Sequence, residues 1–419
     1  MKFLLIINND IDGVGQPAIN LCSNLKKEGH VSKIITLHKF TKNKDIIKVN
    51  RSLILRLLLT LLNVLKKDYS ELFGFGYSTI NYRDIKKHVD NADIIIIYTF
   101  YKIISNEILH KILSSKKIVY FRPCDIELAS GGCHFNEECK KYKSNCKYCP
   151  KLNFLDIFNL PKTNLVAKKK IFEYFKPRVF VQNNYVRNIF KSSATFRNIK
   201  TNALSLGADP KRTKFYSKKS ARKVLGIDSN EKIILFGAFN LESKIKGGHL
   251  LKASLKIFES KFIKNKFTSN NISKVRLITI GNKYNFNPNT SKIKWTHLGL
   301  INSNKKLNLL YRSADVLVCP SLYCFGPHIV TEAISNDLPV VGFNLGTAQG
   351  SIINGINGYV VPCYDILIFA ESIYKILFSK RKKNHHAVIN KIKSNCSSSN
   401  EANYIIRMAT TDLSNTRKQ

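Results

Sequence analysis

Acidic residues are scarce in this sequence. Only 28 Asp and Glu stand against 68 Lys and Arg in 419 residues, which gives a formal net charge of +40. An excess of this size predicts a surface that attracts polyanions. Nucleic acid, anionic lipid and small phosphorylated ligands all fit such a surface. The basic residues are spread along the whole chain, so the charge alone does not choose among these partners.

Motifs typical of nucleic-acid-binding proteins are also missing. The sequence contains no RNA-recognition aromatic motif, no zinc-finger spacing of the two-Cys two-His kind, and no basic region joined to heptads. We therefore do not expect a nucleic-acid partner.

Long hydrophobic runs are absent as well. The longest, residues 53–65, is interrupted by Arg56 and Asn63, so it is too short and too polar to cross a bilayer. Near the N-terminus, Phe3 to Ile7 gives only five apolar residues before a polar segment. A secretory signal would not tolerate that interruption, and we predict a cytoplasmic protein.

The Leu-rich segment 51–67 carries basic residues at both ends and predicts an amphipathic helix. Such a helix can lie on an anionic membrane surface, which would make the protein peripheral at the inner face of the plasma membrane. The alternative is a helix that packs on its own domain.

Short runs rich in Ile and Val alternate with longer helical patterns, which predicts an α/β fold with two Rossmann-like, doubly wound parallel-sheet domains. The pattern restarts at residues 232–239. We expect an N-terminal domain over residues 1–205, a linker over 206–223, a C-terminal domain over 224–377, and a basic polar tail over 378–419. The tail is expected to be weakly ordered or to wrap back over the first domain. The expected strands are 2–7, 31–37, 92–98, 117–121 and 179–182, the last closing the first sheet, and then 232–239, 275–281, 295–300, 315–319 and 338–343.

The turn after the first expected strand, Gly13-Val14-Gly15-Gln16-Pro17-Ala18, has the spacing of a dinucleotide-binding fingerprint. An NAD enzyme should then carry an acidic residue at the end of the second strand, and residues 31–40 contain none. We therefore reject NAD as a cofactor. Two interpretations stay open: a loop around Gly15 that lets a ligand phosphate approach, or a purely structural tight turn.

The second domain carries a sharper pattern. After the strand at 232–239, Lys244, Lys246 and Gly247-Gly248 open a helix. A Lys beside a free helix N-terminus suits a diphosphate, because backbone amides and the ammonium converge on one anion. Further along, Glu332 enters a helix after a Pro-Ser loop, where a carboxylate can accept hydrogen bonds from both hydroxyls of a ribose.

In this order the motifs resemble glycosyltransferase family 4, a large retaining group with the GT-B fold, in which two Rossmann-like domains face each other across a cleft. The resemblance covers nearly the whole chain. It implies transfer of a sugar, with retention and without a catalytic metal or other cofactor, from a nucleotide-diphosphate sugar to a saccharide or lipid-linked acceptor. It implies that Lys246, helped by Lys244 and Gly247, binds the diphosphate and acts in catalysis, and that Glu332 binds the ribose. Gly346 and Thr347 would lie near the sugar and phosphates, and Gly15 would complete the cleft.

The chain departs from the family at two positions. Cys324 stands where the family has an acidic residue that contacts the donor sugar, and a thiol is a much poorer acceptor than a carboxylate. Cys124 replaces the His of a His-Asp pair, which leaves Asp125 either as the base for the acceptor hydroxyl or as a loop cap. A catalytically degenerate protein that binds nucleotide sugar or scaffolds an assembly complex therefore stays an alternative, as does a basic nucleic-acid- or lipid-binding protein.

The remaining distinctive feature is a cysteine cluster, Gly131-Gly132-Cys133-His134-Phe135 followed by Cys139, Cys146 and Cys149. It resembles a branch of the same family found among exopolysaccharide-assembly enzymes, which implies a role in cell-surface polysaccharide biosynthesis. Four thiolates at this spacing could hold a structural zinc ion, and disulfides or unligated thiols are the alternatives. Ten cysteines without an export signal argue for reduced thiols, and we do not expect a catalytic metal.

Overall fold

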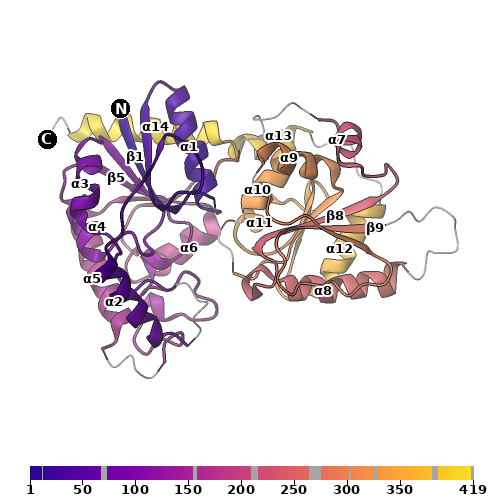
Figure 1. Cartoon of the computed structure of the whole chain (residues 1–419), viewed down its shortest axis with the longest axis horizontal. Coiled ribbons are helices and arrows are strands. Elements are labelled where there is room, and N and C mark those ends of the chain that lie inside the picture. The colour runs from indigo at the N-terminus through magenta and orange to yellow at the C-terminus, as the bar shows by residue number, and fades with distance from the viewer. Residues whose placement is uncertain are drawn as a thin grey trace. The chain divides into compact units, whose positions relative to one another are not determined.

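The structure of the chain is a computed structural model that describes all residues except 12, 68–72, 154–157, 209–215, 264–274, 302, 324, 325, 327, 380–385 and 417–419. The chain forms two compact units (Figure 1). The first comprises Met1–Gly207 with Ser398–Gln419, and the second comprises Ala208–Ser397.

The first unit is built on a seven-stranded sheet in the order β3-β2-β1-β4-β5-β6-β7, with every neighbouring pair parallel. Its strands are β1 (Lys2–Asn9), β2 (Val31–His38), β3 (Ile46–Lys48), β4 (Ile94–Ile97), β5 (Ile118–Phe121), β6 (Arg178–Val181) and β7 (Thr201–Ala203). The five predicted strands are present. The prediction that residues 179–182 close the sheet is wrong, because β7 pairs beyond β6. The two unpredicted strands, β3 and β7, are three-residue edges without an apolar run.

The helices that cover this sheet have an apolar face, and several begin at a residue whose side chain caps the helix N-terminus. The N-cap residue Ser105 accepts a hydrogen bond from the Ile108 N–H at the start of α4, and Asn81 with Asp84 forms a capping box at the start of α3. Strand β4 reads IIII and is fully buried, as expected for a central parallel strand covered on both faces. The helices are α1 (Gly15–Lys27), α2 (Leu53–Leu62), α3 (Tyr82–Asp90), α4 (Asn106–Leu113), α5 (Leu160–Phe175), α6 (Asn184–Ser192) and α14 (Ser398–Thr416), with short 3₁₀ turns η1 (Asn63–Leu65), η2 (Glu127–Ala129) and η3 (Lys141–Lys143).

Helix α14 comes from the segment predicted to be a tail. It packs against α1, and Figure 1 shows it in yellow beside the indigo strands of the first unit. Ala402, Ile405 and Ala409 are buried in the core that α1 and the sheet share. These residues lie three and four positions apart, so they form one apolar helix face within a polar composition. Of the two predicted states, wrapping back over the first domain is therefore the observed one for residues 398–416.

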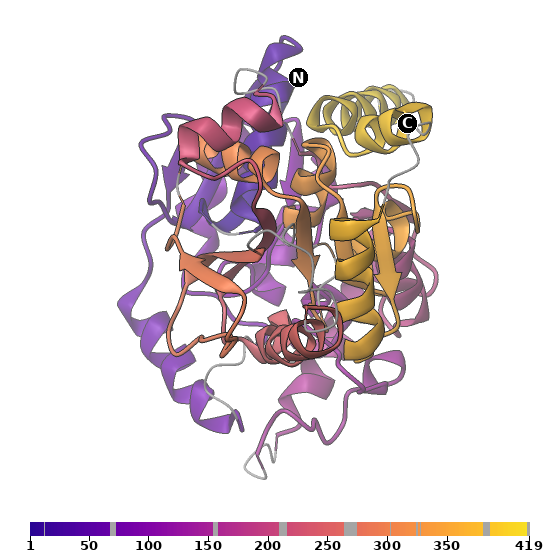
Figure 2. The same cartoon turned by 90° about the vertical axis from the view of Figure 1, so that its right-hand side faces the viewer.

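The second unit has a six-stranded sheet in the order β10-β9-β8-β11-β12-β13, again parallel throughout. Figure 2 shows strands of this unit, in pink to orange, with helices around them. The strands are β8 (Lys232–Asn240), β9 (Val275–Asn282), β10 (Lys294–His297), β11 (Val316–Cys319), β12 (Val340–Phe343) and β13 (Gly358–Val361). The helical elements are α7 (Lys218–Leu225), η5 (Lys244–Lys246), α8 (Gly248–Ile257), η6 (Phe258–Ile263), α9 (Asn304–Ser313), α10 (His328–Ser335), α11 (Gly346–Ser351), α12 (Ile366–Phe378) and α13 (His386–Asn395). Helix α7 begins inside the predicted linker, and much of the rest of that linker, 209–215, lies outside the described residues.

In both sheets the order in which the chain adds strands reverses at the centre, although all strands stay parallel. The chain moves outward from β1 to β3 and then restarts at β4 on the other side, and β8 to β10 and β11 to β13 repeat this arrangement. Two doubly wound domains confirm the predicted fold class. In open sheets of this kind, ligands bind at the carboxyl ends of the two strands that flank the reversal. No helix within the described ranges is long and apolar enough to span a bilayer.

Candidate functional site

The reversal in the second unit lies between β8 and β11, which pair directly. The turn η5, with Lys244 and Lys246, follows β8, and α10, with Glu332, follows the loop after β11. Parallel neighbours end at the same edge of a sheet, so the fold brings the predicted diphosphate and ribose residues to one edge at the reversal. Lys244 is exposed and Lys246 is half-buried.

The two loops at this edge are in direct contact. The Leu322 N–H donates to the Ile245 carbonyl oxygen at 2.9 Å. Gly247 has φ of 71°, and a Cβ at this position would lie 1.8 Å from the Pro320 carbonyl oxygen. A side chain here would force the loops apart, and the left-handed conformation already favours glycine. Gly247 is therefore the residue that allows the Lys246 turn to sit against the loop leading to Glu332.

The carboxylate of Glu332 is held from both sides. The Tyr311 hydroxyl donates to Oε2 at 2.6 Å, and His328 Nδ1 lies 3.0 Å from Oε1. Tyr311 is buried, while the Glu332 side chain is 22% exposed. Burial alone would raise the pKa of Glu332, but the attraction of His328 and the two hydrogen bonds outweigh it, so the pKa lies below its ordinary value. Glu332 is thus an oriented, ionised acceptor with lone pairs left for a ligand hydroxyl.

Other predicted donor residues are only partly placed. Gly346 begins α11 with φ of 53°. The side chain of Thr347 and the whole of Cys324 lie outside the described residues.

Gly15 serves the packing of its own unit. A Cβ on Gly15 would lie 2.6 Å from the Asn9 carbonyl oxygen and 2.7 Å from the Asp10 carbonyl carbon, whereas one on Gly13 would meet nothing within 4 Å. The small residue at position 15 lets α1 start directly against the end of β1. The contacts therefore favour the structural tight turn over a phosphate loop at this position.

Asp125 follows β5 and lies in a buried charged cluster. Its Oδ1 accepts a hydrogen bond from the Glu127 N–H at 2.8 Å, so the capping role is observed. Its Oδ2 lies 3.1 Å from His134 Nδ1, while Glu127 Oε2 lies 3.2 Å from His134 Nε2. Burial alone would lower the pKa of His134, but the two carboxylates outweigh it and raise the pKa to about 10.

Among the described residues, Asp125, Glu127 and His134 form the one group of His, Cys, Asp and Glu whose ligand atoms all lie within 4.8 Å of one another. The two carboxylates approach opposite nitrogens of the imidazole. A metal ion bound to one nitrogen would leave the carboxylate at the other outside its coordination shell, whereas a doubly protonated ring pairs with both. The geometry therefore favours an imidazolium. Sequence reasoning did not assign Glu127 or His134, although an acidic residue two positions after Asp125 was a usable signal.

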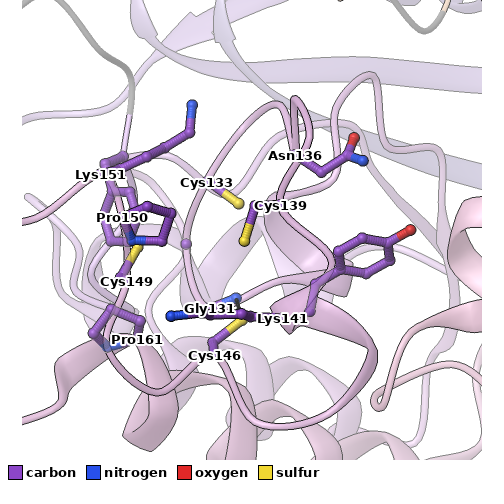
Figure 3. Close-up of a pocket in the computed structure, with 13 residues that line it drawn as sticks. Gly131, Cys133, Asn136, Cys139, Lys141, Cys146, Cys149, Pro150, Lys151 and Pro161 are labelled. Atoms are coloured by element: carbon purple, nitrogen blue, oxygen red, sulfur yellow. Dashed lines mark hydrogen bonds between the residues drawn. The ribbon is translucent and has the colours of Figure 1, made fainter.

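The four predicted zinc ligands line one small cavity of about 20 Å³ (Figure 3). Among the described residues, none of the four forms a disulfide. Burial raises the pKa of Cys133 to about 12 and that of Cys146 to about 11.

A larger cavity of about 670 Å³ opens in the first unit beside the N-termini of α3 and α4. Polar side chains on its wall include Asn81, Arg83, Asn106 and Lys111, together with the exposed ring of Tyr77. Donors and acceptors around an aromatic ring suit a hydroxyl-rich ligand, so this cavity is a candidate acceptor site.

Most of the second unit matches the sequence model of a known protein family. Residues 217–394 match the family model of glycosyl transferases group 1. The matched segment contains Lys246, Gly247 and Glu332, so the residues at the edge of β8 and β11 fall inside it. A comparison with curated protein sequences finds no match.

Solved structures support the same fold over the whole chain. Sucrose-phosphate synthase from Thermosynechococcus elongatus is 15% identical with a TM-score of 0.61, covering 100% of this chain and 99% of its own. Anabaena HepE in complex with UDP and glucose is 14% identical with a TM-score of 0.65, covering 98% and 99%. A glycosyltransferase from Rickettsia africae is 16% identical with a TM-score of 0.60, covering 98% of each chain. The chain has the GT-B fold.

Proposed function

We propose that this protein is a retaining glycosyltransferase that moves a sugar from a nucleotide-diphosphate sugar to a saccharide or lipid-linked acceptor in cell-surface polysaccharide biosynthesis. The observation that carries the proposal is the shared edge of β8 and β11, where the Lys246 turn and the oriented Glu332 carboxylate lie on adjoining loops. The family match over residues 217–394 and the complex of Anabaena HepE with UDP and glucose support a nucleotide-sugar donor. The cysteine pattern supports the exopolysaccharide branch of family 4.

In this proposal the second unit stabilises the leaving group. Lys246, with Lys244 and the amides at Gly247 and Gly248, neutralises the charge that builds on the diphosphate as the bond to the sugar breaks. Glu332 accepts hydrogen bonds from the ribose hydroxyls, and Tyr311 with His328 keeps the carboxylate in place. Leaving-group stabilisation by fixed donors needs no metal ion.

The first unit would receive the acceptor. The polar cavity beside α3 and α4 offers room for a sugar. Asp125 does not line this cavity, and it is the proposed base for an acceptor hydroxyl that reaches the end of β5. One structural observation adds to the departures at Cys124 and Cys324 in favour of a degenerate protein. Both oxygens of Asp125 already have partners, Glu127 N–H and His134, which weakens Asp125 as a proton acceptor.

We further propose that the protein works at the cytoplasmic face of the plasma membrane through α2. Only Leu59 is buried on this helix, while Leu53, Ile54, Leu57, Leu58 and Leu61 are each more than half exposed. Packing on its own domain therefore leaves most of the apolar face in water. Exposed Arg56 and Lys67 add positive charge beside it, which suits an anionic lipid surface.

The donor site is tested by a thermal-shift screen of the pure protein against UDP, GDP, ADP and their sugar conjugates. One nucleotide family should raise the unfolding temperature, and Lys246→Ala and Glu332→Ala should each abolish the rise. Lys256→Ala on the exposed side of α8 and Glu371→Ala on α12 are matched controls that should keep it. If Lys246→Ala and Glu332→Ala behave like these controls, the proposed donor site is wrong.

Turnover is tested separately with the stabilising nucleotide sugar. Hydrolysis or transfer products with the anomeric configuration of the donor, read by nuclear magnetic resonance, would support a retaining transferase. Binding without any product from water or from added saccharide and lipid-linked acceptors would support the degenerate alternative.

A further inference from the structure

The cysteine cluster gathers around one point in the first unit. Cys133, Cys139, Cys146 and Cys149 all line the same cavity, although sixteen positions separate the first from the last. Figure 3 shows the sulfurs of Cys133 and Cys139 pointing toward one another, with Cys146 and Cys149 on the wall of the same cavity. We propose that these four residues bind one structural zinc ion through four thiolates.

The chemistry of the wall selects this ion. Four sulfurs line the cavity, and its wall contains neither a carboxylate nor an imidazole. Thiolates favour zinc in a tetrahedral site and disfavour calcium and magnesium, which need oxygen ligands. On binding, the four thiols release four protons to solvent, and the four sulfur–zinc bonds close the coordination shell. A closed shell leaves no position for a reacting molecule, so the role is structural.

Charge around the cavity complements the product of this reaction. A zinc ion with four thiolates carries a net charge of about −2. Lys141 and Lys151 line the cavity, and the buried Lys168 interacts electrostatically with both Cys133 and Cys146. The Gly131 N–H also donates to Cys146 Sγ at 3.3 Å. Donors aimed at a ligating sulfur stabilise its thiolate and fix its direction.

The backbone carries strain that a metal would offset. Cys146 and Tyr148 have φ of 53° and 52°, a left-handed conformation that non-glycine residues rarely adopt. Tyr148 is 71% exposed, so its own packing cannot compensate. Residues held in such a conformation collect at ligand clamps, where contacts to the ligand offset the strain. Here they turn the chain between Cys146 and Cys149, so that both side chains meet the same cavity.

The segment lacks a core of its own. Between η2 and α5 the described chain contains a single 3₁₀ turn, η3, and the apolar cluster beside it has three buried members, Phe73, Phe75 and Leu152. Cys133 and Cys149 border that cluster. Segments with so little buried surface usually need a cross-link or a metal. The segment also pairs with the chain after α2, through the Phe73–Cys133 and Lys66–Leu152 bridges, so a metal would brace that region as well.

The four sulfurs do not form a group within 4.8 Å of one another in the described structure. A tetrahedral site with zinc–sulfur bonds of about 2.3 Å requires separations of about 3.8 Å. Metal binding must therefore draw the loop from Cys139 to Cys149 toward Cys133. Such closure is expected, since metal sites rarely exist fully formed without the ion.

The test is the metal content of the full-length chain, purified without chelator and without a polyhistidine tag. We expect inductively coupled plasma mass spectrometry to find one zinc ion per chain. The zinc ion should be released when a mercurial reagent modifies the thiols. Cys139→Ser and Cys149→Ser should lose the zinc, whereas Cys124→Ser, a cysteine outside the cavity, should keep it. Zinc that survives both loop substitutions would overturn the proposal.

Variants that fail to fold are covered by a measurement on the unchanged chain. Replacement of the metal by cobalt should give the ligand-field and thiolate charge-transfer bands of a tetrahedral site with four sulfurs. A spectrum of six-coordinate cobalt would contradict the proposed ligands. Metal-free protein whose cluster peptides are joined by disulfides under non-reducing conditions would contradict zinc altogether.

Discussion

Arg122 and Glu401 form an ion pair inside the first unit, although 279 positions separate them in the sequence. Arg122 Nε donates to Glu401 Oε1 at 2.8 Å, and the two side chains are 0% and 1% exposed. Glu401 Oε2 accepts from the Gly207 N–H at 2.7 Å, while the Arg122 guanidinium donates to the carbonyls of Phe180 and Ser205. This pair joins α14 to the strands beside it.

Glu401→Gln should destabilise the first unit strongly. The substitution leaves the Arg122 guanidinium buried without its countercharge, which costs about 3–5 kcal/mol in comparable sites. Thermal unfolding followed by circular dichroism should show a lower midpoint temperature for this unit. Asp90→Asn, which breaks the exposed Lys86–Asp90 pair on α3, should leave the midpoint in place. Equal midpoints for the two variants would mean that the buried pair contributes no more than a surface contact.

Gly247→Ala should abolish nucleotide binding and lower stability. The added methyl group would lie 1.8 Å from the Pro320 carbonyl oxygen in a left-handed conformation, so the Lys246 turn must move. The conformation alone costs about 1–2 kcal/mol for a residue other than glycine. Calorimetric titration with the stabilising nucleotide measures the loss. Gly350→Ala is the control, since a Cβ there meets nothing within 4 Å, and a tight-binding Gly247→Ala protein would show that the two loops need not touch.

Nucleotide affinity should persist in acid until Glu332 is protonated. His328 and Tyr311 hold the pKa of Glu332 below its ordinary value of 4.5, so the carboxylate stays ionised as pH falls from neutral to that value. Because the native pKa is the lower one, the pairing also stabilises the fold above pH 4.5, and this stabilisation disappears as pH falls through the native pKa.

Removing Tyr311 and His328 as partners should shift the pKa of Glu332 in the opposite direction, to above its ordinary value. In a Tyr311→Phe, His328→Gln double variant, burial is left to raise the pKa of Glu332, so affinity should fall at a higher pH than in the unchanged protein. Dissociation constants measured across this acid range compare the two proteins. Superimposable pH profiles would show that the ribose does not depend on the Glu332 carboxylate.

Ile54→Ser with Leu57→Ser should weaken binding to anionic vesicles at least tenfold. Both side chains are more than half exposed on α2, and burying a side chain of this size contributes about 1.5–3 kcal/mol. Co-sedimentation with phosphatidylglycerol vesicles, compared with phosphatidylcholine and with high salt, separates the apolar and charge contributions. Val31→Ser removes an exposed apolar residue from β2 as a control. Undiminished binding by the double variant would exclude α2 as the membrane face.

Periodicity was sufficient to predict most of the sheets. Strands such as β4 and β8 contain uninterrupted apolar runs, and their alternation with helices indicates parallel order without any tertiary information. The edges β3 and β7 could not be predicted, because three residues beside a formed sheet acquire their pairing from the neighbour. Helix α14 could not be predicted either, because its apolar face is short. Ala402, Ile405 and Ala409 are recognisable as core residues only from their packing against α1.

The candidate site divides in the same way. Lys246 and Glu332 follow strands whose order the sequence already implied, so their common edge could be anticipated. The need for glycine at position 247 could not be anticipated, because it arises from the Pro320 carbonyl oxygen on a different loop. Tyr311 lies 21 positions before Glu332, and only the fold shows that its hydroxyl reaches the carboxylate.

The place of α14 has a consequence for synthesis on the ribosome. Translation usually lets an N-terminal domain fold as soon as it emerges. Here the first unit waits for residues 398–416, which are made after the entire second unit, and until then Arg122 has no carboxylate and the face of α1 is uncovered. The second unit, continuous from 208 to 397, should therefore complete its fold first, and the unit encoded first should be the last to become native.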